Sequence, residues 1–402
     1  MKSRISVFLI LLYTLVFNVG KTLRFPNDWA ESHWLMDYRF GFIKRGLAGE
    51  IFGWLFPKTE LSITILSAII LFALYFLLLL ISGKEIFKKE FEVKKILFYL
   101  LFFSSQYIVF SAHLIGYLDH LVLLFTILTV FLIRKKQIFI ASLVAAFSVL
   151  IHEISFLILM PISVFTLIIS QISSEGFSLK LVVKKENVFQ TLQFFSLPLF
   201  ALLSIFLFYD GESLQHAKVF NYLKQNSFIE ENPADSVASG FTKSFSYQWE
   251  AQSPHFFQRV FVSTCAIFYG IPMLAMTLFI FNFFDFKKNL YLFLLLIAVC
   301  FCPLLLHAIA YDTYRIWTFP FVMLFLIFWI MQIYQFPKNE KSPLNIFELF
   351  LFTISIIFTL FIPNHLFDGE VERFSFQIRV LCSLALVFGF VFILKKSNIT
   401  TF

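Results

Sequence analysis

The stretch LSITILSAIILFALYFLLLLIS, residues 61–82, carries no charged side chain from one end to the other. About 20 apolar residues in a helix cross the roughly 30 Å hydrocarbon core of a bilayer, so this segment predicts a transmembrane helix. The whole chain has the same character, since 59% of its 402 residues are hydrophobic, only 14% are charged and 60 are Phe. This composition excludes an ordinary soluble domain and predicts a polytopic membrane protein.

Similar apolar segments recur along the chain and predict an all-α fold, a polytopic transmembrane helical bundle of about 12 spans. The predicted spans cover residues 5–19, 61–82, 96–112, 117–133, 138–151, 155–172, 191–209, 258–284, 289–309, 316–335, 344–362 and 378–394.

If the predicted spans cross the membrane alternately, every second connection lies on the same side of it. Basic residues cluster in these connections, among them 134–136, 180–185, 287–288 and 338–341. Cytoplasmic loops are enriched in Lys and Arg, so this pattern predicts that both termini are cytoplasmic. The same topology explains the net charge of +7, which therefore predicts no nucleic-acid partner. A bias toward Phe, Ile and Lys is typical of an AT-rich bacterial genome, so we expect a multi-pass protein of the bacterial inner (plasma) membrane.

Three regions follow from this topology. Residues 1–210 form a membrane module whose first outer loop spans residues 20–60, residues 211–257 form a long outer loop, and residues 258–402 supply the C-terminal membrane helices. All eight His residues fall on the outer half, whereas none lies in a predicted cytoplasmic loop. The outer face is therefore where we expect the chemistry.

The four Cys residues all lie in predicted spans, so we interpret them as small core residues. The Cys300-x-Cys302 pair has no second pair of ligands near it in sequence, and no metal site is predicted. The chain also contains no Walker loop, dinucleotide-binding fingerprint or nucleophile elbow.

The first outer loop contains residues 37–46, DYRFGFIKRG, which hold one acid and three bases. Charges close to a membrane are costly and are usually functional. Apolar residues continue from there at helical spacing and predict an interfacial helix with one apolar stripe. The members of that stripe are Phe40, Ile43, Leu47, Ile51 and Trp54.

A second strip of the same predicted helix holds Asp37, Gly41, Lys44 and Ala48, with Arg45 at its edge. The small residues leave room for a phosphate or a sugar between the acid and the bases. Arg offers a planar fork to phosphate oxygens and Lys offers a point charge. The alternative interpretation is a simple interfacial anchor in which Asp37 pairs with Lys44 or Arg45.

Two further polar pairs occur where there is almost no loop to solvate them, Asp119-His120 and His152-Glu153. Asp119 begins a predicted span, where the helix dipole by itself favours an acid. The His152-Glu153 couple is interpreted either as a structural hydrogen bond or as a group that orients a hydroxyl acceptor or binds a divalent cation. The cofactor is therefore unknown, with a divalent cation as one alternative.

The fifth outer loop ends in Asp312 and Arg315, just before a predicted span. The neighbouring aromatic residues are typical of a membrane interface. We interpret Arg315 as a candidate contact to a lipid phosphate, and Asp312 as part of the same substrate-binding group.

This layout resembles the GT-C glycosyltransferases: a first span, a long outer loop that carries an acid, and a second acid at a short later outer loop. The resemblance covers mainly residues 1–210. It implies a polytopic enzyme that uses a polyprenyl-phosphate-linked sugar on the non-cytoplasmic face. It implies that Asp37 is the catalytic base or positions the acceptor, and that Asp119 is the catalytic residue at the second acidic position. The chain departs from the family pattern in having no Asp-x-Asp pair and no large soluble C-terminal domain.

The resemblance also implies how the substrates are bound. Arg315 matches the bases that hold the donor phosphate, with help from Lys44 and Arg45. The expected partners are the polyprenyl-phosphate-linked sugar, a glycan, lipid or protein acceptor, and membrane lipids. The full set of candidate substrate-binding residues is Arg39, Lys44, Arg45, His120, His152, Glu153, Asp312 and Arg315.

Two other functions fit parts of the sequence. An O-antigen or exopolysaccharide polymerase has a comparable number of spans and one sizeable late outer loop, which residues 211–257 would supply, with His255 at its end. A secondary transporter has a similar span count, but it places its charges near the membrane midplane and in matched halves. The charges of this chain crowd the outer boundary instead.

Overall fold

The computed structural model describes residues 2–88, 92–172, 184–208, 216–336, 345–366 and 369–396. Within these ranges the chain is helical, with a single isolated β-bridge between His365 and Val371. The prediction of an all-α fold is confirmed for this part. The predicted basic connections at 180–183 and 338–341, and the start of the long outer loop, lie outside the described residues.

Helices lie at all the predicted spans. They are α1 (Lys2–Gly20), α4 (Glu60–Ile86), α5 (Val93–Ser104) with α6 (Gln106–His113), α7 (Asp119–Arg134), α8 (Ile138–Ile151), α9 (Ser155–Ile172), α11 (Lys185–Phe208), α15 (Cys265–Phe268) with α16 (Gly270–Phe283), α17 (Leu290–Phe301), α18 (Thr313–Ile333), α19 (Ile346–Leu360) and α20 (Phe376–Lys396). Seven helical stretches of the described chain are long and apolar enough to cross a membrane. These stretches indicate a membrane protein.

The centre of the bundle is built from α5, α6 and α18, whose apolar side chains are almost completely buried. Aromatic rings fill this centre. Phe98 stacks on Phe328 and Phe102 stacks on Phe325, each with ring centroids 4.2 Å apart. By contrast, α4 and α11 expose much of their apolar surface, as a helix in contact with lipid does.

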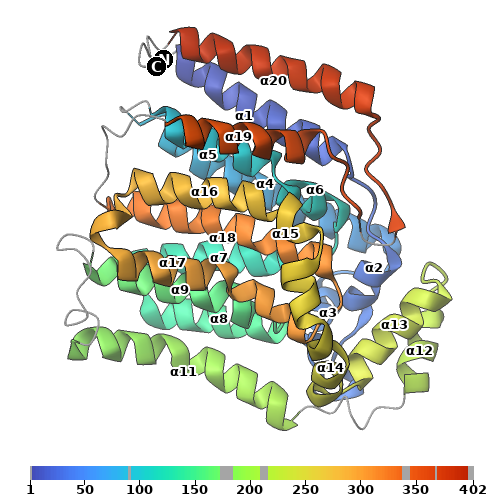
Figure 1. Cartoon of the computed structure of the whole chain (residues 1–402). Coiled ribbons are helices and arrows are strands. Elements are labelled where there is room, and N and C mark those ends of the chain that lie inside the picture. The colour runs from blue at the N-terminus through green and yellow to red at the C-terminus, as the bar shows by residue number, and fades with distance from the viewer. Residues whose placement is uncertain are drawn as a thin grey trace.

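The bundle has two distinct ends. Figure 1 shows the start of α1 and the end of α20 side by side at one end. The short helices α2 (Asp28–Leu35), α3 (Gly46–Leu55), α12 (His216–Lys224), α13 (Glu231–Thr242) and α14 (Phe245–Gln252) gather at the opposite end. The first and fourth predicted outer loops therefore share one end of the molecule.

The predicted helix from Asp37 to Trp54 is wrong, because the chain breaks twice within it. A short 3-10 turn, η1 (Tyr38–Phe40), ends at Gly41 with φ 87°, and α3 begins only after Arg45, which has φ 61°. Glycine tolerates positive φ and weakens a helix, so the chain turns at Gly41. The predicted strip of Asp37, Gly41, Lys44 and Ala48 therefore does not exist.

The predicted apolar stripe is wrong for the same reason. Only Leu47, Ile51 and Trp54 of that stripe lie on α3, and Trp54 is 74% exposed. The buried face of α3 is formed instead by its small residues together with Phe52. A Cβ atom built on Gly49 would stand 2.0 Å from the carbonyl oxygen of Met36, so α3 packs directly on the backbone that follows α2.

A buried ion cluster joins the two ends of the chain. Glu372 lies 2.6 Å from Arg379 Nη1 of α20 and 3.9 Å from Lys21 Nζ, which follows α1. Lys21 Nζ also donates to the carbonyl of Thr359 at the end of α19. All three charged side chains are at most 2% exposed, so their charges are compensated mainly within the protein.

Candidate functional site

The best-defined polar contact of the molecule joins α7 to α18. Arg315 donates from Nε and Nη2 to the two carboxylate oxygens of Asp119, each at 2.7 Å. The Arg315 guanidinium also lies 5.0 Å from the ring centre of Tyr117 and donates from Nη1 to Asp312 at 2.9 Å. A two-pronged pair of this kind fixes both side chains, so Arg315 has one defined orientation.

His152 and Glu153 extend this contact toward the first predicted outer loop. His152 lies between two carboxylates, with Nε2 3.7 Å from Asp119 and Nδ1 3.3 Å from Glu153. Arg45 Nε in turn donates to both oxygens of Glu153 at 3.0 Å. We refer to Asp119, Arg315, Asp312, His152, Glu153, Arg45 and His33 as the charge network.

The charge network begins at His33 of α2. His33 Nδ1 lies 2.6 Å from the carbonyl of Trp29, so this nitrogen carries the hydrogen and Nε2 accepts from Arg45 Nη1 at 3.1 Å. Burial, with a further contribution from the neighbouring Arg45, lowers the pKa of His33 to about 3. His33 is therefore a neutral acceptor that holds the guanidinium in place.

The central ion pair of the charge network stays ionised. Burial alone would raise the pKa of Glu153, but Arg45 and His152 outweigh it and hold that pKa well below its usual range. Burial likewise opposes the charge of Arg45, yet Glu153 raises the pKa of the guanidinium. Glu153 of the His152-Glu153 couple is thus occupied by the ion pair with Arg45. This contact favours the structural interpretation of the couple over a cation site.

A cavity of about 590 Å³ opens beside the charge network. Arg315 and Asp312 form part of its wall, Arg259 forms another part, and His255 comes from the end of the long outer loop. Tyr311 and Tyr314 add aromatic surface. The cavity therefore combines two guanidinium groups, one carboxylate and one imidazole.

Arg259 differs from the other arginines of this region in its partners. Its guanidinium donates to the carbonyls of His307 and Ala310 at 3.3 and 3.0 Å and to the side-chain oxygen of Gln252 at 2.8 Å. All these acceptors are neutral, and no carboxylate within the described ranges forms an ion pair with Arg259. Its positive charge is therefore available to an anion in the cavity.

Sequence reasoning missed Arg259 as a site residue. The signal was present, because Arg259 is a charge at the very start of a predicted span, residues 258–284. A charge in that place is usually functional. His33 was missed as well, and only its contact to Arg45 identifies its part in the network.

Asp37 lies in a different environment. It accepts from Arg39 Nε and Nη2 at 2.7 and 2.8 Å and forms an ion pair with Lys58. It lines a second cavity of about 590 Å³, which shares no lining residue with the cavity of Arg259 and Arg315. The contacts thus bring Asp119 together with Arg45, His152, Glu153, Asp312 and Arg315, but they do not bring Asp37 to them.

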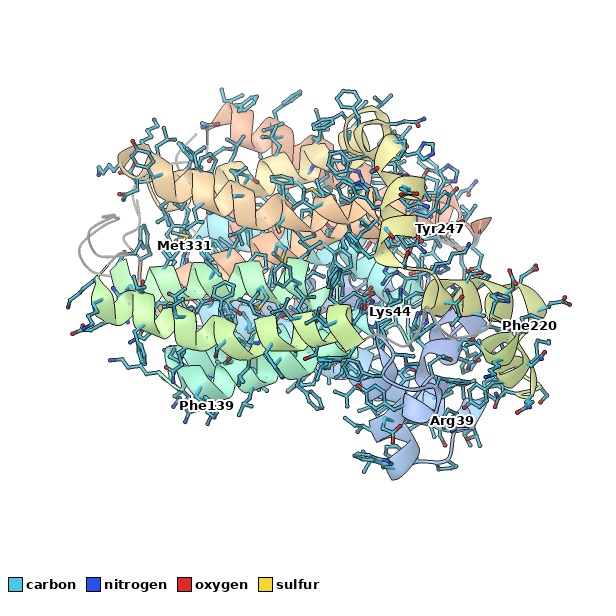
Figure 2. The ribbon with its side chains drawn as sticks, turned by 90° about the horizontal axis from the view of Figure 1, so that it is seen from below. Arg39, Lys44, Phe139, Phe220, Tyr247 and Met331 are labelled. Atoms are coloured by element: carbon cyan, nitrogen blue, oxygen red, sulfur yellow. The ribbon has the colours of Figure 1, made fainter. Side chains whose placement is uncertain are left out.

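The two remaining candidate residues lie at the margins. Lys44 Nζ reaches the carbonyl of Lys243 at 3.5 Å, just after α13. Figure 2 shows Lys44 where the N-terminal segment meets the helix bundle, with Arg39 further out on the same segment. His120 follows Asp119 in α7 and is buried, and its Nδ1 makes no hydrogen bond within the described chain.

The donor set does not favour a metal. In the described part of the chain, no group of three or more His, Cys, Asp or Glu side chains is arranged to hold a metal ion. The four Cys residues are free thiols. The cation-binding alternative for His152-Glu153 thus gains no support from a third ligand.

Comparisons with known proteins give no neighbour: no protein-family model matches the chain, and no curated protein or solved structure matches it.

Proposed function

We propose that the protein is a membrane glycosyltransferase that moves a sugar from a polyprenyl-phosphate-linked donor to a glycan, lipid or protein acceptor. The observation that carries this proposal is the cavity in which Arg259 and Arg315 face one space together with Asp312. Guanidinium groups form strong, charge-assisted hydrogen bonds to phosphate oxygens. The cavity therefore suits the phosphate of a lipid-linked donor.

The two arginines have different roles in this proposal. Asp119 holds Arg315 by both carboxylate oxygens, which orients its guanidinium and offsets its charge. The hydrogen-bond acceptors of Arg259 are all neutral, so no carboxylate occupies its guanidinium and it can meet the phosphate oxygens directly. Negative charge develops on the departing lipid phosphate during transfer, and a fixed cation stabilises that charge.

Asp312 is the proposed base. Asp312 lines the cavity, and the single hydrogen bond to its carboxylate within the described ranges comes from Arg315. Asp312 takes the proton of the acceptor hydroxyl while the hydroxyl oxygen bonds to the sugar C1 and the bond from C1 to the phosphate oxygen breaks. Asp119 is a weaker choice, since Arg315 occupies both of its oxygens. Asp37, the base that the family resemblance implies, lines the other cavity.

The proposal includes a topology of about 12 spans in a bacterial inner membrane, with both termini cytoplasmic and the cavity on the non-cytoplasmic side. Supporting it, the start of α1 and the end of α20 share one end of the bundle, whereas α2, α3 and α12 to α14 share the other (Figure 1).

Substitution of Arg259 tests the proposal. Arg259→Ala should lower transfer from a polyprenyl-phosphate-linked sugar by about 100-fold, the usual effect of removing one group that stabilises transition-state charge. Arg259→Lys should restore part of the activity because it keeps the charge. Lipid extracts of cells that carry the Ala variant should accumulate one polyprenyl-linked sugar.

Arg134→Ala is the matched control, since Arg134 ends α7 at its far end from Asp119 and is exposed. Its transfer rate should equal that of the unaltered protein. Unchanged transfer in Arg259→Ala, with no lipid-linked sugar accumulating, would remove the cavity from the proposed reaction.

One observation favours a polymerase as the second candidate function. His255, from the end of the long outer loop, lines the same cavity as Arg259 and Arg315. A polymerase would use these groups to hold a diphosphate-linked saccharide and to activate the incoming one. Product length separates the two functions, because a polymerase makes a ladder of repeat units and a simple transferase adds one sugar.

A further inference from the structure

The cavity around Asp37 is a second built site at the same end of the molecule. Its volume is about 590 Å³, and its wall runs from η1 through the end of α3 to the segment before α4. Two carboxylates, Asp37 and Glu50, and two cations, Arg39 and Lys58, face it. The formal charges therefore balance, which distinguishes this cavity from the one that holds Arg259.

The contacts within the cavity disfavour an anionic ligand. Arg39 and Lys58 both bind the carboxylate of Asp37, and Lys58 Nζ also donates to the carbonyl of Leu35 at 2.9 Å. Side-chain hydrogen bonds from Arg39 and Lys58 lower the pKa of Asp37 despite its burial, so it stays ionised and keeps both cations. A phosphate would have to displace Asp37 from these partners.

Groups that remain for a ligand include both donors and acceptors. Glu50 Oε2 accepts from the backbone N–H of Tyr38 at 3.1 Å, whereas no hydrogen bond within the described chain reaches its Oε1. Arg39 uses Nε and Nη2 on Asp37, and its guanidinium lies 4.6 Å from the ring centre of Tyr222. Its side chain is still 50% exposed, and no hydrogen bond within the described chain uses Nη1. Sugar hydroxyls donate and accept at once, and they match such a mixture.

An exposed aromatic ring completes the wall. Trp54 is 74% exposed although it lines the cavity, and Phe56 beside it is 46% exposed. Flat aromatic rings cover the apolar C–H face of a pyranose ring as they cover other apolar surface. Leu61 and Ile65 of α4 continue the exposed surface, and α4 is apolar enough to span a membrane. The cavity thus opens beside the lipid-facing helix.

We propose that this cavity binds the neutral sugar ring of a saccharide presented at the membrane surface. The ring would stack on Trp54, with its hydroxyls on Glu50 Oε1 and Arg39 Nη1. In the proposed glycosyl transfer, this saccharide is part of the acceptor. That role rests on the proposed function, but the binding itself does not.

Photo-crosslinking in nanodiscs tests the binding without any transfer reaction. Three diazirine-bearing lipids with identical chains serve as probes: a diglucosyl diacylglycerol, a phosphatidylethanolamine and a phosphatidylglycerol. The glycolipid should label the peptide that contains residues 50–58 most strongly. Trp54→Ala and Glu50→Gln should each lower this labelling by about fivefold or more, since each removes roughly 1 kcal/mol of contact.

Trp249→Ala is the matched control, because Trp249 is also an exposed Trp, at 49%, but lies on α14 and does not line the cavity. Its labelling should equal that of the unaltered protein. Free maltose should compete with the glycolipid if the sugar ring alone is recognised. Failure of maltose to compete, with the Trp54 effect intact, identifies the lipid-linked saccharide as the ligand.

Two results would overturn the proposal: equal or stronger labelling by either phospholipid, or glycolipid labelling that survives both substitutions. Neither bears on Arg259, whose test measures transfer and donor accumulation. Loss of transfer in Arg259→Ala together with phospholipid labelling at Trp54 would leave the proposed function standing and reject the saccharide site.

Discussion

Asp312 and Asp37 carry the same functional group in different surroundings, which makes them a direct test of the proposed base. Asp312→Asn keeps the shape and the hydrogen bond to Arg315 but cannot take a proton. We expect its kcat for sugar transfer to fall about 100-fold or more. Asp37→Asn should instead raise the KM for the acceptor and leave kcat nearly unchanged.

The assay is transfer in proteoliposomes with both variants reconstituted at equal amounts. A kcat of Asp312→Asn close to that of the unaltered protein would exclude Asp312 as the base. A collapse of kcat in Asp37→Asn alone would return the base to the residue that the family resemblance implies.

The buried carboxyl group of Glu31 in α2 should make the stability of the folded protein depend on pH. Burial, together with the nearby charges of Glu60 and Asp28, raises its pKa from the usual 4.5 to about 8. The folded state therefore keeps a proton that the unfolded state releases. The stability that this proton supplies is fully present below pH 4.5 and is lost as the pH rises through 8.

Glu31→Gln is neutral at every pH and removes this dependence. At pH 8 we expect the variant to be more stable than the unaltered protein by on the order of 2 kcal/mol, and so to unfold at a higher temperature. At pH 4.5 the two should unfold together. Thermal unfolding in detergent at both pH values measures the difference in stability between the variant and the unaltered protein. A difference that is the same at pH 4.5 and pH 8 would contradict the prediction.

At the level of single residues, the sequence indicated most of the charge network but not its pairings. Asp119, His152, Glu153 and Arg315 stood out because charges are rare at the ends of apolar segments. Their partners could not be read from the sequence, since Arg315 and Asp119 belong to helices far apart in the chain. Local spacing paired Asp37 with Lys44 or Arg45, whereas the fold supplies Lys58.

At the level of elements, Gly49 fixes how α3 packs. A Cβ atom there would meet the backbone oxygen of Met36 at 2.0 Å and that of Trp34 at 2.6 Å. Gly49→Ala must therefore push α3 away from the segment after α2, and we expect a loss of stability of about 2 kcal/mol or more. Thermal unfolding in detergent measures the loss.

Gly240→Ala is the control for this prediction. Gly240 lies in α13, and a Cβ atom there would meet nothing within 4 Å. Alanine is favoured over glycine in a helix interior by about 1 kcal/mol, so this variant should be as stable as the unaltered protein or more so. Equal destabilisation by both substitutions would show that contact with Met36 is not the cause.

The elements divide into those that hydropathy predicts and those that it does not. Long apolar segments predicted the helices of the bundle, because burying or solvating a helix in lipid requires a continuous apolar run. The first predicted outer loop followed other rules. There Gly41 and the hydrogen bonds of Asp37 to its own neighbours decided the backbone, and a helical repeat of apolar residues was misleading.

At the level of the whole molecule, labelling of introduced cysteines tests the proposed topology. In a variant without the native Cys residues, Glu231→Cys on α13 and Lys288→Cys after α16 place one exposed thiol at each end of the bundle. A membrane-impermeant maleimide added to intact spheroplasts should label position 231 and should leave position 288 unlabelled until the membrane is opened. The reverse pattern would invert the proposed orientation.

The buried cluster of Lys21, Glu372 and Arg379 has a consequence for biogenesis. The ribosome synthesises Lys21 long before it synthesises Glu372. In the proposed topology, α1 therefore enters the membrane while its neutralising carboxylate does not yet exist. The cluster closes only when α20 arrives beside α1, so the contacts of the first helix are completed by the last one. A nascent chain halted before Glu372 carries a Lys21 side chain without its carboxylate partner. This unpaired charge destabilises the incomplete protein and would expose it to the quality-control proteases of the membrane.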